Sequence, residues 1–309
     1  SKPARLQIPG AELAWTSDDA LSMQALPESV IIIGAGVIGL EFASILDAFG
    51  VKVTVVEYCK EILPPFDSEV AKRLRMALKR RGIEILTDTQ VMAIEPGMTV
   101  RCLAKKKEKE ICADRVIMAV GRRPVIPSGL AECGAVVERG ALAVDDNMEL
   151  RWTDGTAPAD VKIYAIGDVN GRCMLAHAAT AQGEIVLGEK RDMTVVPSAV
   201  FTMPECAMVG MTEEQCVAKG LAIRIGKATF RANGKALAMG ETDGMVKVIA
   251  DVGSGRMLGC SVCGPHAADL VQEAAAVMTA GLPAQVIADT IHSHPTLGET
   301  VRAAVAQLM

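Results

Sequence analysis

The sequence predicts an α/β protein in which a domain built on a parallel sheet comes first and a separate α+β domain comes last. A continuous apolar run at residues 30–33 ends in glycine, which is typical of a strand buried on both faces. A helical stretch at 37–49 and a β-branched strand at 51–56 complete a βαβ unit. After residue 196, strand-like segments precede helical ones, which is typical of an α+β domain.

The other elements follow from apolar periodicity and from the glycines and prolines that separate the segments. A second helix is expected at 67–81, followed by short strands at 83–87, 90–95, 98–104 and 111–120, as in a βαβ core that carries a β-meander. Residues 115–120 are expected to return as a buried strand. Residues 128–159 read as loop with short strands at most, before a strand at 162–166 and a helix at 176–189. The last domain should contain strands at 198–202, 206–209, 222–230, 244–251 and 257–263, and helices at 266–280, 283–290 and 298–308.

Composition narrows the class of protein. At about 100–200 residues per domain, 309 residues allow two or three domains. A net charge of -5 argues against a nucleic-acid partner and against an anionic membrane surface. No apolar run approaches the ~20 residues of a membrane span. The nine cysteines are odd in number and irregularly spaced, which favours reduced thiols in a cytoplasmic protein.

The segment at 34–39 reads GAGVIG, a GxGxxG motif that follows a buried strand and opens a helix. In that context Gly34 permits a tight turn, Gly36 lets a pyrophosphate approach the backbone, and Gly39 allows close packing of helix on strand. The free N–H groups at the helix start suit the phosphates. The motif therefore predicts a Rossmann-like dinucleotide site, against the alternative of a purely structural glycine turn.

Glu57 stands at the end of the next strand, 18 residues after Gly39. A carboxylate can accept hydrogen bonds from both hydroxyls of the adenosine ribose, but it would repel a 2′-phosphate. The three residues after Glu57 include no arginine cluster that could hold such a phosphate. The sequence therefore favours NAD over NADP.

The stretch at 291–300, IHSHPTLGET, contains the residues of an acid–base pair. A histidine with a nearby carboxylate is what a general base needs, and Glu299 comes five residues after His294. His292 reads more simply as a packed or interface histidine. Cys260 and Cys263 form the only CxxC in the sequence, which is either a redox or half-metal motif or two small thiol residues on a buried strand.

Six segments occur in an order that resembles the flavoprotein disulfide reductases (class I pyridine nucleotide-disulfide oxidoreductases), most of all their lipoamide-type members. They are VIIIGAGVIGLE, MAVGRRP, YAIGDV, MLAHAA, FTMPECAMVGMTE and HSHPTLGET. The resemblance implies three regions: an NAD-binding domain with its linker at 1–123, the second segment of an FAD-binding domain at 124–195, and an interface (dimerisation) domain at 196–309. The expected fold is thus a Rossmann-like domain with an inserted meander, a remnant of the FAD domain and an α+β interface domain.

The resemblance also implies roles for single residues. Glu41 would lie near the nicotinamide of NAD, and Gly121 would approach the same cofactor. Asp168 would hold the ribityl–phosphate part of FAD, unless it only caps a turn. The helix start that faces the flavin pyrimidine would consist of Leu175, Ala176 and His177, with the backbone rather than the His177 side chain in the active role.

By the same resemblance, His294 is the base that deprotonates dihydrolipoamide or the attacking thiol, and Glu299 orients it. The His294–Pro295 bond is a candidate cis peptide. The implied assembly is a homodimer through the C-terminal domain, and the implied partner of the parent enzyme is the lipoyl domain of a 2-oxo acid dehydrogenase or glycine cleavage complex.

The sequence departs from the family at three points. Val125 and Gln182 stand where an asparagine and an acidic residue are usual. The family's CxxxxC redox pair has no counterpart, so the chain is expected to be a fragment without the N-terminal FAD segment, inactive on its own. The alternatives are a related NADH-dependent disulfide reductase and a non-catalytic NAD-binding module.

Overall fold

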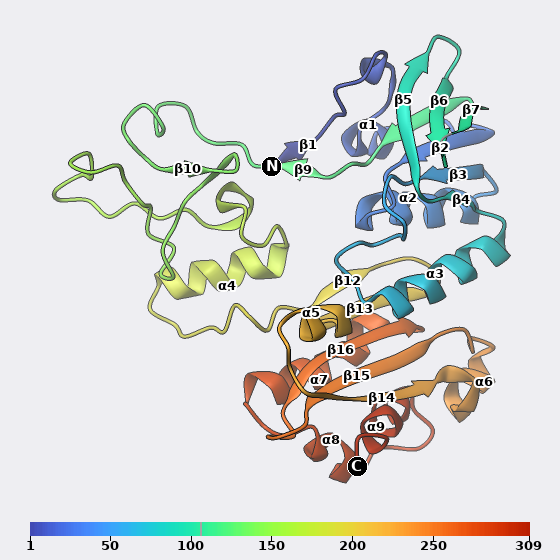
Figure 1. Ribbon diagram of the computed structural model, residues 1–309, viewed down its shortest axis with the longest axis vertical. Helices are drawn as coiled ribbons and strands as arrows, with labels where there is room; N and C mark the ends of the chain where they lie inside the picture. Colours follow the sequence, from blue (N-terminus) through green and yellow to red (C-terminus); the bar gives the residue numbers. More distant parts are fainter. Residues whose placement is uncertain (106) are drawn as a thin grey trace. The chain divides into compact units, whose positions relative to one another are not determined.

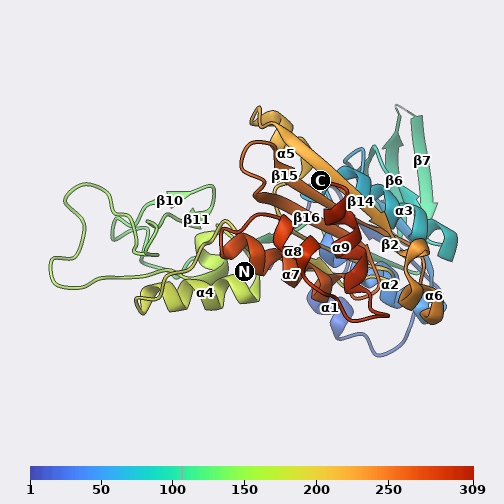
Figure 2. The ribbon, with the colours of Figure 1, turned by 90° about the horizontal axis from the view of Figure 1, so that it is seen from below.

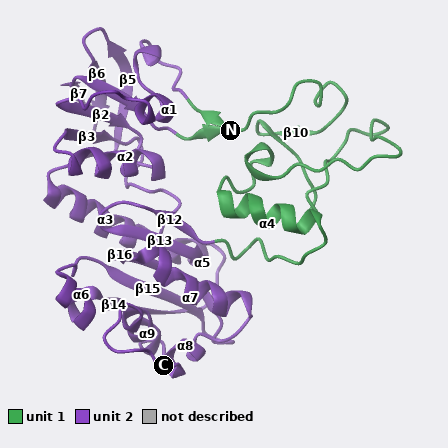
Figure 3. Ribbon diagram, turned by 180° about the vertical axis from the view of Figure 1, so that it is seen from behind, with its two compact units in different colours: residues 1–4, 121–196 green, residues 5–120, 197–309 purple. Residues whose placement is uncertain are grey.

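The computed structural model describes residues 1–105 and 107–309. Lys106, in the basic run for which a hairpin tip is expected, lies outside the described residues. The chain divides into two compact units, one of residues 1–4 and 121–196 and the other of residues 5–120 and 197–309 (Figure 3). The sequence-based domain boundaries remain predictions.

The larger unit begins with the expected βαβ core. Its parallel sheet has the order β4–β3–β2–β8, from Glu84–Leu86, Lys52–Val56, Ser29–Ile33 and Arg115–Met118. The helices α2 (Val37–Ala48) and α3 (Ser68–Arg81) follow β2 and β3. The short helix α1 (Ser17–Leu21) was not expected. All four residues at 30–33 are buried, which explains why the strand reads as a continuous apolar run.

The meander lies between β4 and β8, as predicted, and consists of β5 (Thr89–Glu95), β6 (Thr99–Ala104) and β7 (Lys107–Cys112). The continuous strand expected at 111–120 is wrong, because residues 111–112 end β7, but residues 115–118 form β8, the buried strand expected to return at 115–120. Asp114 lies between them: its carboxylate accepts a hydrogen bond from the Ser29 N–H at 2.8 Å and ties the break to the first residue of β2.

The C-terminal part of this unit is an antiparallel sheet of order β12–β13–β16–β15–β14. Its strands are Ser198–Val200, Glu205–Gly210, Met257–Gly264, Met245–Asp251 and Ile223–Thr229. The helices α7 (Ala267–Thr279), α8 (Gln285–Asp289) and α9 (Gly298–Ala306) match the predicted ones to within a few residues. Two short helices, α5 (Glu213–Ala218) and α6 (Gly234–Met239), were not expected.

Helices cover both faces of this antiparallel sheet. Helix α3 packs on β13, β15 and β16 from one side, whereas α7 and α9 pack from the other (Figure 1). Seen from below, α7, α8 and α9 accordingly lie in front of the strands (Figure 2). The parallel-sheet domain thus contributes one of the layers that bury the C-terminal sheet, which explains why the two regions form one compact unit.

The smaller unit has little regular structure besides α4 (Ala176–Val186). Two-residue strands pair as β1 (Lys2–Pro3) with β9 (Arg122–Arg123), and as β10 (Val137–Glu138) with β11 (Ala141–Leu142). The strand expected at 162–166 is wrong, since Tyr164 makes only a single bridge with Glu149. A small apolar cluster stabilises the loops; it includes Leu142, Val144, Met148 and Leu150.

Candidate functional site

The glycine turn between β2 and α2 has the geometry that the motif predicts. Gly34 has φ +104, in the left-handed region that favours glycine, and a Cβ at Gly39 would collide with the Gly34 carbonyl oxygen. A Cβ at Gly36, by contrast, would meet no protein atom within 4 Å. Two of the glycines are therefore required by the fold, while Gly36 leaves open space above the turn.

Helix α2 begins directly at this turn. Gly36 is its N-cap and provides no side-chain cap, and the first turn of the helix carries no acidic residue. The first N–H groups and the positive end of the helix dipole are thus left for an anion. The local structure fits a pyrophosphate approaching over Gly36.

Glu57 links the turn to the end of β3. Its carboxylate is 7% exposed and accepts hydrogen bonds from the Ala35 N–H at 2.6 Å and the Cys59 N–H at 2.7 Å. Each carboxylate oxygen has two lone pairs, so both oxygens keep capacity for a further donor such as a ribose hydroxyl. Glu57 thus supports the turn itself in addition to its predicted role in ligand binding.

Glu41 lies one turn into α2 and faces the C-terminal domain. Its Oε1 accepts a hydrogen bond from the Phe201 N–H at 3.0 Å. Burial raises the pKa of this carboxyl, and the bond from Phe201 only partly opposes that shift. Nearby, the Met203 N–H donates to the Ser44 hydroxyl at 3.0 Å, so residues 201–203 are fixed along the helix that starts at the glycine turn.

His294, in the loop between α8 and α9, meets Glu299 of the first turn of α9. The Nδ1 of His294 lies 2.9 Å from Oε1 of Glu299, and the peptide bond between His294 and Pro295 is cis. The imidazole is 76% exposed, and among the described residues its Nε2 makes no hydrogen bond. The arrangement presents Nε2 to an incoming donor while the carboxylate fixes the other side of the ring.

Two contacts hold the Glu299 carboxylate in place. Its second oxygen accepts a hydrogen bond from the Thr296 N–H at 2.8 Å. This backbone bond, followed by the bond with His294, lowers the pKa of Glu299. The carboxylate therefore stays ionised and can stabilise a protonated His294.

His292 lies packed against α7. The side chain is 10% exposed, and its Nε2 lies 3.1 Å from a Glu273 oxygen. Its Nδ1 lies 3.0 Å from the Thr290 carbonyl oxygen. Both contacts anchor the loop that carries His294, in agreement with a packed rather than a reacting histidine.

The predicted flavin residues all belong to the smaller unit, as does Gly121. Asp168 lies in a short 3-10 helix at residues 167–170 and accepts a hydrogen bond from the Ser1 hydroxyl. Leu175 is the N-cap of α4 and provides no side-chain cap for its first turn. Ala176 and His177 are exposed in that turn.

Gln182 supports the structure of this region. The sequence shows Gln182 only as a departure from the family pattern. The side chain is fully buried, and its Oε1 accepts hydrogen bonds from the Gly167 N–H at 2.7 Å and the Asn170 amide at 2.8 Å. It thereby ties the turn that carries Asp168 to α4. No sequence signal short of the structure indicates this role.

The CxxC cysteines lie on β16, and both are buried. Burial raises the pKa of the Cys260 thiol to about 12, which leaves almost no thiolate at neutral pH. The geometry agrees with small thiol residues on a buried strand.

Among residues 1–105 and 107–309, no group of three acidic, cysteine or histidine side chains is placed to bind a metal. Within the same ranges no helix combines the length and apolarity needed to cross a membrane.

Two family models together match nearly the whole chain. Residues 1–183 match the model described as pyridine nucleotide-disulphide oxidoreductase. Residues 196–305 match the model of the dimerisation domain of the same oxidoreductases. The predicted fold class, a dinucleotide-binding α/β region followed by a dimerisation domain, is confirmed. Members of this family use FAD and NAD(P).

Dihydrolipoyl dehydrogenases from several organisms are similar in sequence to this chain over most of its length. Dihydrolipoyl dehydrogenase of Bacillus subtilis is 38% identical over 311 residues, which cover 95% of this chain and 64% of that protein. The Thermus scotoductus enzyme of the same name is 37% identical, with 100% of this chain and 68% of that protein covered. The chain thus spans roughly two thirds of the length of these relatives.

Solved structures show the same likeness in three dimensions. The Cu(II) complex of the HOCl-induced flavoprotein disulfide reductase RclA from Escherichia coli matches with a TM-score of 0.87 at 30% identity, covering 100% of this chain and 71% of that one. LpdA from Mycobacterium tuberculosis matches with a TM-score of 0.83 at 28% identity, covering 100% and 68%. The chain therefore belongs to the pyridine nucleotide-disulphide oxidoreductase family.

Proposed function

We propose that this chain supplies the NAD-binding and dimerisation parts of a dihydrolipoyl dehydrogenase, which oxidises dihydrolipoamide and reduces NAD⁺. The observation that supports it most is the 2.9 Å contact between His294 and Glu299. A base with a fixed orienting carboxylate is useful to an enzyme that must deprotonate a thiol. The identity of 37–38% to dihydrolipoyl dehydrogenases adds to this support.

In the proposed reaction His294 accepts a proton at Nε2 from a substrate thiol. Glu299 holds the ring through Nδ1 and stabilises the imidazolium that results. The exposed imidazole suits a thiol that arrives from outside the chain, on a lipoyl group or on a second subunit. A homodimer through the C-terminal domain would bring such a subunit, and that domain matches the family's dimerisation model.

NAD would bind over the glycine turn. Gly36 and the start of α2 would hold its pyrophosphate, Glu57 its adenosine ribose, and Glu41 would lie near its nicotinamide, which accepts hydride when bound. Gly121 is proposed to approach the same cofactor. The two buried N–H contacts of Glu57 fix the carboxylate where a 2′-phosphate would meet a negative charge. We therefore expect NADH to bind more tightly than NADPH.

FAD would contact the smaller unit through Asp168 and the start of α4, at Leu175, Ala176 and His177. The positive end of the α4 helix dipole would stabilise a ligand that gains negative charge, and no acidic residue stands in the first turn of this helix. FAD relays electrons between thiols and the nicotinamide when bound. In this chain Asp168 and the first turn of α4 would only bind and orient it.

A second candidate is a related flavoprotein disulfide reductase with a different substrate. The observation behind this second candidate is the likeness to RclA, which matches with a TM-score of 0.87, while LpdA matches with a similar score of 0.83. The His294–Glu299 pair supports the first candidate, because a fixed base suits an enzyme that must deprotonate a dithiol substrate.

Complementation tests the proposal. The chain is assayed for NADH-dependent lipoamide reduction alone and after addition of the flavin-binding, CxxxxC-containing segment of a dihydrolipoyl dehydrogenase, in trans or by fusion. We expect no activity alone and measurable activity after addition. A complemented protein that reduces other disulfides but not lipoamide would support the second candidate. Activity of the chain alone would contradict the assignment and direct attention to Cys260 and Cys263.

A further inference from the structure

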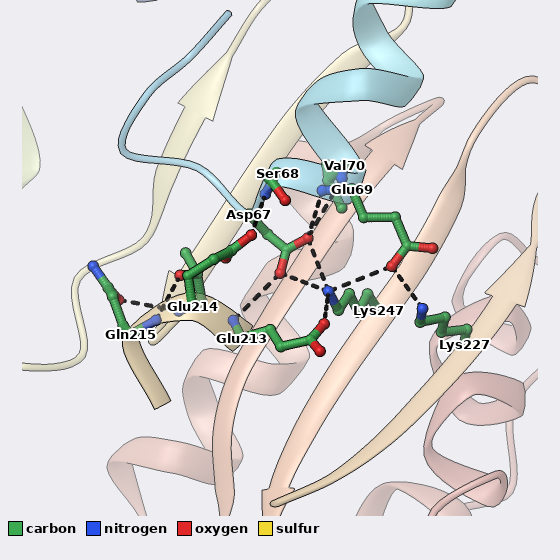
Figure 4. A network of polar contacts seen from close by, with 10 residues as sticks. Asp67, Ser68, Glu69, Val70, Glu213, Glu214, Gln215, Lys227 and Lys247 are labelled. Carbon is green, nitrogen blue, oxygen red and sulfur yellow. Dashed lines mark hydrogen bonds and ion pairs between the residues drawn. The ribbon is translucent and has the colours of Figure 1, made fainter. Parts of the chain in front are cut away.

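Lys247 is a cation buried between the two domains of the larger unit. Its side chain is 2% exposed, and its Nζ lies 2.8 Å and 3.0 Å from the Asp67 oxygens and 2.6 Å from a Glu213 oxygen (Figure 4). Glu69 lies 3.4 Å away. A buried charge is costly unless it is paired, and here every partner is a carboxylate. Lys247 comes from β15, whereas Asp67 and Glu69 come from the start of α3.

Asp67 is satisfied on all sides and is 0% exposed. One oxygen accepts hydrogen bonds from the Glu69 and Val70 N–H groups at 3.1 Å and 3.4 Å, which caps α3. The other accepts a hydrogen bond from the Glu213 N–H at 3.4 Å, at the first residue of α5. The C-terminal domain therefore fixes the position of Asp67 as firmly as its own helix does.

The contacts of the cluster favour the charged forms of Lys247 and Glu69. Burial opposes the charged form of Lys247, but hydrogen bonds with Asp67 and Glu213 outweigh it and raise the lysine pKa. Burial also opposes ionisation of Glu69, but Lys227 and Lys247 lower its pKa. The cluster thus acts as an ionic joint between the domains.

A strained loop connects this joint to the glycine turn. Residues 58–66 run from Glu57 to Asp67, and in their middle the Leu63 N–H donates to the Ala35 carbonyl at 2.9 Å. Leu63 has φ +47, a left-handed conformation that is unfavourable for leucine, and is buried. Glu61 pairs with Arg75 of α3, at 2.7 Å and 3.0 Å. The loop is therefore held at the turn on one side and at α3 on the other.

We propose that Lys247 is a positioning residue for the dinucleotide site, although it lies in the C-terminal domain. By fixing Asp67 and the start of α3, it holds the loop 58–66 in the conformation in which Leu63 supports Ala35 of the glycine turn. The inference rests on the proposed binding of NAD at that turn. Loss of the joint allows the loop to leave its strained conformation, which reduces the fraction of molecules competent to bind.

NADH titration of single variants of the whole chain tests this role. We expect Lys247→Met to raise the Kd for NADH about three- to tenfold, because apparent affinity falls with the competent fraction. Lys247→Arg can still pair with Asp67 and should restore affinity to within about twofold of wild type. Lys227→Met is the matched control, since Lys227 is an exposed lysine that contacts Glu69 at 2.6 Å and leaves Asp67 untouched.

A second variant covers the case in which Lys247→Met leaves Asp67 as a buried unpaired charge and prevents folding. Asp67→Asn combined with Lys247→Met removes both charges and keeps an oxygen to cap α3. It should bind NADH as weakly as Lys247→Met. Val305→Ala, in the buried face of α9, serves as a control for lost stability and should keep the wild-type Kd.

Hydrogen exchange supplies a local readout that a general loss of stability would not reproduce. The two variants are compared under conditions that give them equal thermal stability. The Leu63 amide should then exchange faster in Lys247→Met than in Val305→Ala. The inference would be overturned, and the proposed function left intact, if Lys247→Met kept wild-type affinity for NADH and unchanged exchange at Leu63. If Lys247→Met does not fold, the same result in the double variant would overturn it. Failure of the wild-type chain to bind NADH would instead overturn the proposed function and the inference with it.

Discussion

The Glu57 carboxylate accepts a hydrogen bond from the Ala35 N–H at 2.6 Å, so the end of one strand is fixed to the glycine turn at the end of its neighbour. The two strands are parallel and in register, with Ile33 opposite Val56. The acidic residue and the turn therefore form one preorganised surface. A rigid surface of this kind binds a dinucleotide with little ordering cost.

Two of the motif glycines, Gly36 and Gly39, should respond differently to substitution by alanine. Gly36→Ala should leave stability almost unchanged, because its Cβ meets no protein atom within 4 Å, but it should weaken NADH binding by filling the space expected for the pyrophosphate. Gly39→Ala should destabilise the chain itself, since its Cβ would collide with the Gly34 carbonyl. Thermal melts and NADH titrations separate the two effects. Equal losses of stability in both variants would contradict the interpretation.

Glu41→Gln should stabilise the chain at neutral pH. The pKa of Glu41 is raised by burial, so its ionisation opposes folding as pH rises through the range above its unfolded value. Gln cannot ionise and still offers an oxygen to the Phe201 N–H. Tm measured against pH should show the variant above wild type at pH 7, with the difference vanishing below about pH 4. A constant difference across this range would show that burial of the charge is not the cause.

Removal of the base should abolish most activity of the complemented enzyme. His294→Gln should lower kcat for dihydrolipoamide oxidation by about 10²–10⁴-fold, the usual contribution of a general base. Glu299→Gln should have a smaller effect, because the base remains while its orientation and charge support are lost. NADH binding by both variants should match wild type and is the control. A His294→Gln enzyme with wild-type kcat would remove the dyad from the reaction.

The pKa of Glu299 is held below its usual range by the Thr296 N–H and by His294. This lowered pKa sets the pH range in which the carboxylate contacts stabilise the loop. The folded carboxylate releases its proton more readily than the unfolded one, so its contacts stabilise the fold above the unfolded pKa. They are lost as pH falls through the lowered folded value. Carboxyl NMR titration of Glu299 should give a pKa below about 4.3. A value at or above that figure would mean that the Thr296 N–H contact is absent in solution.

Gln182→Ala should destabilise the smaller unit by about 1–3 kcal/mol, because the Gly167 N–H and the Asn170 amide would lose a buried acceptor. Urea unfolding provides the measurement. Gln272→Ala is the matched control, since Gln272 is exposed on α7 and should change stability by less than about 0.5 kcal/mol. Equal stability of the two variants would contradict the buried role of Gln182.

The sequence was most informative where local chemistry decides the structure. The glycine turn, the buried strand at 30–33 and the pairing of His294 with Glu299 depend on residues close along the chain. The β7–β8 break could not be predicted, because it depends on Asp114 bonding to Ser29, 85 positions away. The same holds for Lys247 and Asp67, which are 180 positions apart and form a pair that no local pattern signals.

Equilibrium titration of the chain with NADH and NADPH, followed by nicotinamide fluorescence, tests the central claim most directly. We expect NADH to bind at least about tenfold more tightly than NADPH, since the fixed Glu57 carboxylate repels a 2′-phosphate, and about 1.4 kcal/mol corresponds to that factor. Glu57→Gln should reduce the ratio. Equal affinity for the two cofactors, or binding of neither, would contradict the account.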